Sequence, residues 1–425
     1  MSRRPSRLPL LACVALLAFA LAGCGKKSHQ PLGMGPARGV APLSSSGAVS
    51  VITSNTARIG GANVAVDAAA VARTVYPGLT AATRPAMVLL VGEQDWPAAL
   101  AAAAFASAPA HAPLLYSQGN TLPSVTSEAL QAMGPKGDVG LGATQLIAIG
   151  TKAPTPKSLD TRTLPATDAA ATAATIERLL QASAGGSPPK QVIVVPSNAP
   201  RALQMPAAGL AAESGAPILY TTGEALPAPT RAVLSQLQHP SIYVLNPRFA
   251  GKKSLGELAQ LGRVTQISGT AGSEGPAMNA IAVARYTDGN FGWGVKEPGH
   301  GLVFLDDQRP LDAPAAALLS STGDYAPPLL LERPSAVGVS LASYLADIQP
   351  AYSASQPQFQ AVRGVYNRGW LIGDDRALST IVQAELDAQL AIAPAQQAIG
   401  ENSQTEAEGE AETPATQTET NSEQP

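Results

Sequence analysis

The chain has 425 residues, of which 45% are hydrophobic and 14% charged, and its formal net charge is −3. Setting aside three arginines in the first seven residues and seven glutamates in the last 25 leaves 25 basic and 24 acidic residues. This near-neutral body argues against a nucleic-acid-binding protein, which would show a basic face, and the length is enough for two to four domains.

The N-terminal segment has the layout of a secretory signal. Three arginines precede an apolar run from Leu8 to Leu21, which is too short to span a bilayer comfortably. Its end, Leu21-Ala22-Gly23-Cys24, resembles the lipobox of bacterial lipoproteins. By that resemblance, residues 1–23 are a signal peptide and Cys24 carries a lipid that anchors the chain on the extracytoplasmic face of a cell membrane. The alternative is a plain signal peptide followed by a chance cysteine.

The segments that flank the body are predicted to be unstructured. Residues 24–50 are rich in Gly, Pro and Ser and are interpreted as a flexible tether. Residues 393–425 form an acidic tail without aromatic residues, and we expect this tail to be disordered. The only other cysteine, Cys13, lies inside the signal, so no disulfide is predicted. No later run is long and apolar enough for a transmembrane helix.

The body is an internal repeat with steps of 104 and 110 residues. An Ala-Pro pair followed by large apolar residues occurs three times, at Ala112–Tyr116, Ala216–Tyr220 and Ala326–Leu331. A four-residue apolar run keeps the same steps, at Val88–Val91, Val192–Val195 and Leu302–Leu305. Two further markers are 104 residues apart: Leu122-Pro123 with Thr126 matches Leu226-Pro227 with Thr230, and Arg58-Ile59 matches Arg162-Thr163. The predicted repeats are 51–155, 156–260 and 261–392.

Each repeat alternates short buried strands with Ala- and Leu-rich helices. In the first copy we expect, in chain order, a helix over 64–76, a strand over 87–91, a helix over 97–108, a strand over 112–116, a helix over 123–133 and a strand over 145–149. Short connections between alternating elements predict parallel pairing with right-handed crossovers. The predicted fold class is α/β: three tandem three-layer α/β repeats with mostly parallel sheets, with a pseudo-threefold body as one arrangement.

The order of motifs in the first copy resembles the type 2 cell-wall-binding repeat. The motifs are Arg58-Ile59-Gly60-Gly61-Ala62, Val88–Gly92, Trp96–Ala102, Ala112-Pro113-Leu114-Leu115 and Leu122-Pro123, and the third copy ends with the similar Leu371–Asp375. The resemblance covers roughly 51–392, and it implies a non-catalytic protein that binds cell-wall glycan or an anionic secondary polymer. The sequence departs from the family pattern where Asn63-Val64-Ala65 replaces Asp-Arg-Tyr and where Ala98 replaces an aspartate, which Asp312 keeps in the third copy.

Four residues are candidate polymer contacts: Arg58, Arg162, Asp312 and Trp293. The arginines either pair with acids between repeats or line a groove for an anionic polymer. Trp293, in the Gly-rich insertion 288–300, either stacks on a sugar ring or packs inside, whereas Trp96 and Trp370 are expected to pack at element ends. Asp306-Asp307 and Asp374-Asp375 follow predicted strands, and helix capping is favoured over a cation or sugar contact.

The sequence shows no recognisable catalytic or metal-binding pattern. The histidines, His29, His111, His239 and His300, are scattered, so no metal or other cofactor is predicted. No phosphate loop or Gly-x-Ser-x-Gly elbow occurs, so the chain is predicted not to be an enzyme. The leading prediction is an envelope lipoprotein that associates with cell-wall polymer through three repeats. The alternative is a substrate-binding lipoprotein of a transport system, although three equal repeats argue against its two lobes.

Overall fold

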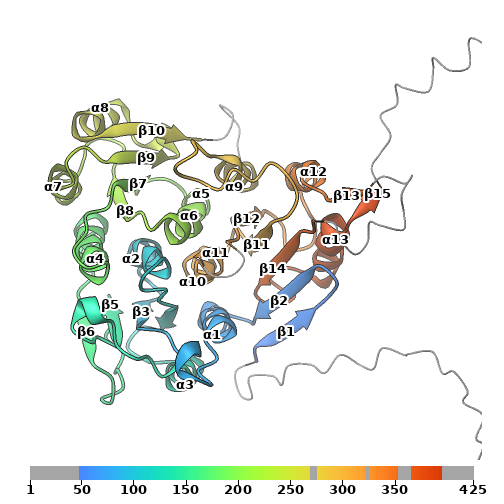
Figure 1. Cartoon of the computed structure of the whole chain (residues 1–425), viewed down its shortest axis with the longest axis horizontal. Coiled ribbons are helices and arrows are strands. Elements are labelled where there is room, and N and C mark those ends of the chain that lie inside the picture. Colours follow the sequence, from blue (N-terminus) through green and yellow to red (C-terminus); the bar gives the residue numbers. More distant parts are fainter. Residues whose placement is uncertain (1–46, 269–274, 322–324, 353–364, 395–425) are drawn as a thin grey trace, which may run out of the picture. The chain divides into compact units, whose positions relative to one another are not determined.

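The computed structural model describes residues 47–268, 275–321, 325–352 and 365–394 (Figure 1). All of them belong to one compact unit, Val40–Pro425. The predicted signal peptide with Cys13 and Cys24, most of the tether and nearly all of the tail lie outside the described residues. Within the described part, none of the helices has the length and hydropathy needed to cross a membrane.

Six elements of the first copy match those expected from its sequence, and two strands that precede them were not predicted. After strands β1 (Val49–Ile52) and β2 (Thr56–Gly60), the expected elements are α1 (Val64–Val75), β3 (Val88–Gly92), α2 (Trp96–Ala102), β4 (Leu114–Ser117), α3 (Ser124–Met133) and β5 (Leu146–Ile149). Asp95 caps the start of α2, where its side chain accepts a hydrogen bond from Ala98 N at 3.3 Å. The helix expected over 97–108 ends at Ala102 and continues as a 3-10 turn, Ala103–Ala106.

The second and third copies repeat this order. The second contains β6 (Thr161–Leu164), α4 (Ala169–Ser183), β7 (Gln191–Pro196), α5 (Arg201–Gln204), α6 (Pro206–Ser214), β8 (Ile218–Thr221), α7 (Ala228–Gln236), β9 (Ser241–Leu245) and α8 (Lys252–Leu261). The third contains β10 (Arg263–Ile267), α9 (Pro276–Arg285), β11 (Gly301–Asp306), α10 (Asp312–Ala316), α11 (Leu318–Ser321), β12 (Pro328–Leu331), α12 (Val339–Asp347), β14 (Arg368–Ile372) and α13 (Thr380–Leu390). Strands β13 (Ala351–Tyr352) and β15 (Ala393–Pro394) form a small separate pair.

The three main sheets share one topology, and each contains one strand from another copy. Their orders are β4-β3-β5-β6, β8-β7-β9-β10 and β12-β11-β14-β2, with β1 added antiparallel to β2. Apart from the β1–β2 pair, all neighbours in these sheets are parallel. The first strand of each copy thus completes the sheet of the preceding copy, and β2, near the start of the described chain, completes the sheet of the third. Figure 1 shows these blue strands beside the red β14.

The register confirms that the repeated motifs occupy equivalent positions. The pairs β3–β4, β7–β8 and β11–β12 contain Leu89↔Leu114, Ile193↔Ile218 and Val303↔Pro328, which follow the 104- and 110-residue steps. A repeated threonine has the same role in two copies: Thr126 donates to the carbonyl of Tyr116 at 2.9 Å, and Thr230 to that of Tyr220 at 2.6 Å. The α/β fold class and the internal repetition expected from the sequence are therefore present in the structure.

Helices α2, α6 and α10 pack against one another between the sheets (Figure 1). Two equivalent tyrosines tie the copies together there, because the hydroxyl of Tyr116 donates to Leu311 O at 2.7 Å and that of Tyr220 to Pro97 O at 2.9 Å. The acceptors are also equivalent, since each lies 15 residues before the Ala-Pro pair of its copy. In the third copy, Leu330 occupies the place of the tyrosine, so this hydroxyl contact is absent there.

Candidate functional site

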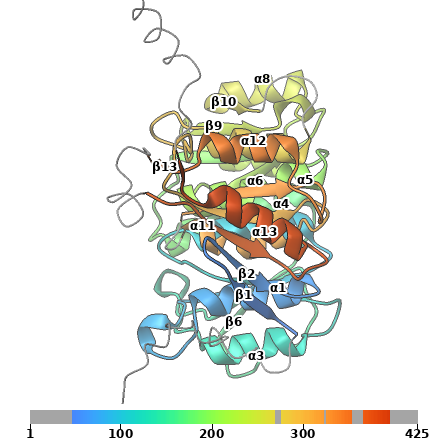
Figure 2. The ribbon, with the colours of Figure 1, turned by 90° about the vertical axis from the view of Figure 1, so that its right-hand side faces the viewer.

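Arg58 is buried at the junction between the first and third copies. Its side chain is 2% exposed and lies on β2, which is enclosed by β14, β1 and helix α13 (Figure 2). The guanidinium donates hydrogen bonds to four oxygens: Gln383 Oε1 at 3.0 Å, Gly373 O at 3.2 Å, Asp374 O at 2.8 Å and Ser379 O at 3.2 Å. Burial lowers the pKa of Arg58, while the nearby charges of Asp375 and Asp374 oppose that effect. These bonds hold the first copy's strand to the last segment of the third.

Arg162, expected to be the counterpart of Arg58, is exposed and occupies a different register position. Leu146 pairs with both Val88 and Thr161, whereas its equivalent, Gly369, pairs with Leu302 and Thr56. Thr56 therefore corresponds to Thr161, and Arg58 to Thr163. Because side chains alternate across a strand, the two arginines lie on opposite faces of their sheets. In addition, β6 is an edge strand, whereas β2 is flanked on both sides.

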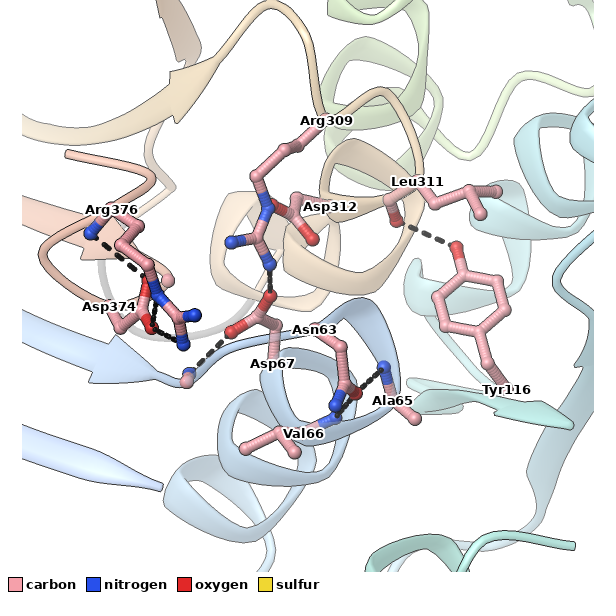
Figure 3. A network of polar contacts seen from close by, with 12 residues as sticks. Asn63, Ala65, Val66, Asp67, Tyr116, Arg309, Leu311, Asp312, Asp374 and Arg376 are labelled. Atoms are coloured by element: carbon pink, nitrogen blue, oxygen red, sulfur yellow. Dashed lines mark hydrogen bonds and ion pairs between the residues drawn. The ribbon is translucent and has the colours of Figure 1, made fainter. Parts of the chain in front are cut away.

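A cluster of two aspartates and one arginine lies beside this junction (Figure 3). Asp67 on α1 and Asp312 at the start of α10 both have side chains that are 0% exposed, and Arg309 forms ion pairs with both. Arg309 Nε lies 2.9 Å from Asp312 Oδ2, and Asp67 Oδ1 accepts a hydrogen bond from Gly61 N at 2.6 Å. Neither oxygen of Asp312 accepts a hydrogen bond of normal geometry. The cluster therefore holds two buried carboxyl groups and one guanidinium.

Burial raises the pKa values of both carboxyl groups. The pKa of Asp67 rises to about 6 because burial outweighs the lowering effects of Arg309 and the Gly61 N–H. The pKa of Asp312 is also raised, by burial first and then by the adjacent charge of Asp67. Two carboxylates beside one cation repel each other at low dielectric, so the arrangement favours a single proton shared by the pair.

A surface pocket of about 410 Å³ opens next to this cluster. Its lining includes Asn63, Arg201, Gln308, Arg309 and Asp312. These residues come from the segments that follow β2, β7 and β11, so the pocket lies at the carboxyl ends of parallel strands, where open α/β sheets commonly bind ligands. Arg201 is exposed. Because Arg309 is ion-paired with Asp67 and Asp312, Arg201 is the lining residue that is suited to a phosphate or carboxylate group.

The paired aspartates after the strands cap turns. Asp306 Oδ1 accepts a hydrogen bond from Gln308 N at 2.9 Å, and Asp374 Oδ1 accepts one from Arg376 N at 3.1 Å. Asp374 Oδ2 also pairs with the Arg376 guanidinium at 2.8 Å. Helices α10 and α13 instead have Leu311 and Ser379 at their N-caps, so the capping favoured by the sequence occurs in turns rather than at helix starts.

The three tryptophans are buried or half-buried in the protein. Trp96 is 3% exposed, and its Nε1 donates to Gln204 Oε1 at 3.2 Å, which links the first two copies. Trp370 and Trp293 are half-buried, and the indole nitrogen of Trp293 is buried without a hydrogen-bond partner. The insertion that carries Trp293 packs on the second copy, where Phe291 stacks on Tyr243 with a centroid distance of 3.7 Å.

Sequence reasoning did not identify Asp67, Arg309 or Arg201. Arg201 directly follows a proline and Arg309 directly precedes one, and these two prolines occupy equivalent positions of the second and third copies. The repeat alignment could therefore have identified both arginines once Asp312 was noted. The sequence around Asp67 contains no motif that would mark this residue as part of a site. Across the described ranges, no group of three or more His, Cys, Asp and Glu side chains has the geometry of a metal site.

No protein-family model matches this sequence, and no curated protein sequence matches it. Among solved structures, it is similar to two cell wall proteins of Clostridium difficile. Cwp6 superposes with a TM-score of 0.61 at 16% identity, over 81% of this chain and 51% of that one. Cwp8 superposes with a TM-score of 0.58 at 18% identity, over 80% of this chain and 52% of that one. The chain spans about half the length of these proteins, and what it shares with them is the α/β fold.

Proposed function

We propose that this chain is a non-catalytic envelope lipoprotein that associates with cell-wall polymer through its three α/β repeats. In this proposal Cys24 carries the lipid, the membrane contact is made by that lipid, and the body faces the extracytoplasmic side. The lipobox-like end of the leader supports the anchor, and the fold shared with two cell wall proteins supports the association with the wall.

The observation that carries the binding proposal is the 410 Å³ pocket with the exposed Arg201 in its lining. Arg309 is held in place by Asp67 and Asp312, so its position is fixed before any ligand arrives. Arg201 is exposed at the rim and is the residue we assign to the first contact with a phosphate or carboxylate of the polymer. Arg58 is left out of this assignment because its guanidinium is used inside the protein.

Arg162 and Trp293 are proposed as secondary contacts. Arg162 is exposed on the edge strand β6, and Trp293 is half-buried in the insertion. Individual surface contacts of this kind are weak and screened by salt, with a Debye length of about 8 Å at physiological ionic strength. Contacts spread over three copies on one polymer gain from effective concentration, which can multiply affinity by roughly 10²–10⁴.

The alternative function, a substrate-binding lipoprotein of a transport system, has one supporting observation. The pocket volume of about 410 Å³ lies in the range of roughly 300–1,000 Å³ that small-molecule sites occupy. A protein of that class would gain thermal stability from a soluble metabolite, whereas a wall-binding protein would sediment with purified sacculi.

The test is co-sedimentation with sacculi, with and without their secondary polymers, across a salt series. We expect Arg201→Ala to weaken binding several-fold, while Arg178→Ala, which removes an exposed arginine on α4, leaves binding unchanged. If the unaltered protein fails to sediment at low salt, the wall-binding proposal is wrong. Equal binding by Arg201→Ala would place the contact outside this pocket.

The anchor has a separate test. Cys24→Ala should release the protein from membranes, because the residue that would carry the lipid is gone. Membrane fractionation after a high-salt wash measures this release. Retention of the variant in the membrane fraction would contradict the lipid anchor and leave the wall-binding test unaffected.

A further inference from the structure

A second, smaller pocket lies between the first and second copies. It has a volume of about 110 Å³, and its lining includes Ser107 and Ala108 of the first copy together with Glu177, Gln181 and Ser187 of the second. At roughly 30 Å³ for each water molecule, it has room for a small ion with about two waters. It is separate from the 410 Å³ pocket, with which it shares none of its lining residues.

The main feature of this pocket is an unpaired buried carboxyl group. Glu177 on α4 is 3% exposed, and its Oε1 has no hydrogen-bond partner. Burial raises the pKa of Glu177, and the charge of Arg178 only partly opposes that effect. The Arg178 guanidinium is directed back along its own helix, where it donates to Ala174 O at 3.2 Å and Thr175 Oγ1 at 3.0 Å. Among the described lining residues there is no lysine, arginine or histidine to balance the carboxylate.

Two other side chains add oxygen acceptors to the pocket. Gln181, one helical turn after Glu177, uses its amide nitrogen on Gly186 O at 3.0 Å, which leaves its amide oxygen as an acceptor. Ser107 is 3% exposed and gives its hydroxyl proton to Ala104 O at 2.7 Å, so its lone pairs are available. The pocket thus combines one carboxylate with neutral oxygen atoms that can act as ligands to a cation.

We propose that this pocket binds a small monovalent cation, such as sodium, potassium or ammonium, through the Glu177 carboxylate with Gln181 and Ser107. One bound positive charge offsets the cost of burying one carboxylate. Calcium is a poorer match, because it takes six to eight oxygen ligands, commonly from several carboxylates. Since Ser107 belongs to the first copy and Glu177 to the second, the ion would also join the two copies.

The experiment compares thermal unfolding of the purified chain in sodium, potassium or ammonium chloride with unfolding in N-methyl-D-glucamine chloride, whose cation is too large for the pocket. Ionic strength is held at about 150 mM and pH at about 8, so that the carboxyl group is ionised. We expect at least one small cation to raise the melting temperature by about 1–3 °C. Glu177→Gln should remove this difference, and the exposed Glu224→Gln should keep it.

A crystal grown with rubidium chloride supplies the direct readout, as an anomalous peak beside Glu177. The proposal is overturned if the unaltered protein melts at the same temperature in all four salts, or if Glu177→Gln retains the cation effect. A rubidium peak only at other places would also overturn it. Because the readout is a difference between salts, a change in the stability of Glu177→Gln itself does not affect the conclusion.

Discussion

The first copy meets its two neighbours through junctions of different chemistry. Toward the second copy, Tyr220 donates to Pro97 O and Trp96 donates to Gln204. The hydroxyl of Ser183 also donates to the buried carboxyl group of Asp138, and none of these contacts involves an arginine. Toward the third copy, Arg58 and the ion pairs of Arg309 are added to the equivalent tyrosine contact. At the first junction, β6 follows β5 within about a dozen residues, whereas β2 and β14 are more than 300 residues apart.

This difference has a physical reason. A short connection keeps β6 close to its partner strand β5, so the pairing of these two strands costs little loop-closure entropy. The strand β2 pairs with β14 across almost the whole described chain. The buried Arg58 guanidinium makes its four hydrogen bonds only when this pairing is correct. Buried charged groups of this kind can specify one arrangement, because any misplaced pairing leaves them unsatisfied. We infer that the polar cluster at the third-copy junction fixes how the two ends of the body meet.

The largest expected effect is that of Arg58→Ala. The variant loses four hydrogen bonds and removes the Arg58 donor from the buried carbonyl oxygen of Gly373, so we expect a loss of about 2–4 kcal/mol in the free energy of unfolding. Denaturant unfolding measures it. The exposed Arg162→Ala is the control and should change stability by less than about 0.5 kcal/mol. Similar losses for the two variants would show that the junction is not specified by Arg58.

The buried aspartate pair predicts an unusual pH dependence. Both carboxyl groups have pKa values raised in the folded state, that of Asp67 to about 6, so the folded protein binds more protons than the unfolded chain above pH 4. Their contribution to stability is fully present below the unfolded pKa of about 4. The contribution of Asp67 is lost as pH rises through about 6, and that of Asp312 is lost as pH rises through its own raised pKa.

Asp312→Asn should remove most of that dependence. It keeps the Asp67–Arg309 ion pair and removes the second charge, so the variant should be more stable than the parent by about 1–3 kcal/mol at pH 7, with little difference at pH 4. Urea unfolding from pH 4 to pH 8 gives both curves. A variant that is less stable at pH 7 would mean that Asp312 is ionised and useful in the folded state. Glu224→Gln, at an exposed carboxyl group, is the control.

The smallest effect concerns the contact that the two junctions share. Tyr116→Phe and Tyr220→Phe each remove one hydroxyl that donates to a backbone carbonyl, and each should cost about 1 kcal/mol. Thermal or denaturant unfolding of both variants sharpens the comparison. Equal losses indicate that the junctions differ only in their charged groups. A much larger loss for Tyr116→Phe would mean that the third-copy junction depends on the tyrosine as well.

Much of the local structure could be predicted from the sequence. Buried apolar runs bounded by Gly and Pro predicted β3, β4 and β5 of the first copy, although not β1 and β2. The constant steps predicted the equivalent positions, as the Leu89↔Leu114 and Ile193↔Ile218 pairs confirm. These features depend on residues close together in the chain, so periodicity and composition determine them. The α/β class follows from the same alternation.

The tertiary structure alone decided how the copies are joined and which polar residues meet. Arg58 and Arg162 look alike in sequence, but a shift of one register position and the covering of β2 by β1 and α13 make one buried and the other exposed. Asp67 meets Arg309 across 242 residues, and no local pattern predicts that contact. The sequence by itself therefore determined the repeating units, because each is specified by short-range periodicity. The position of the candidate site depends on long-range strand pairing and burial, which only the folded chain fixes.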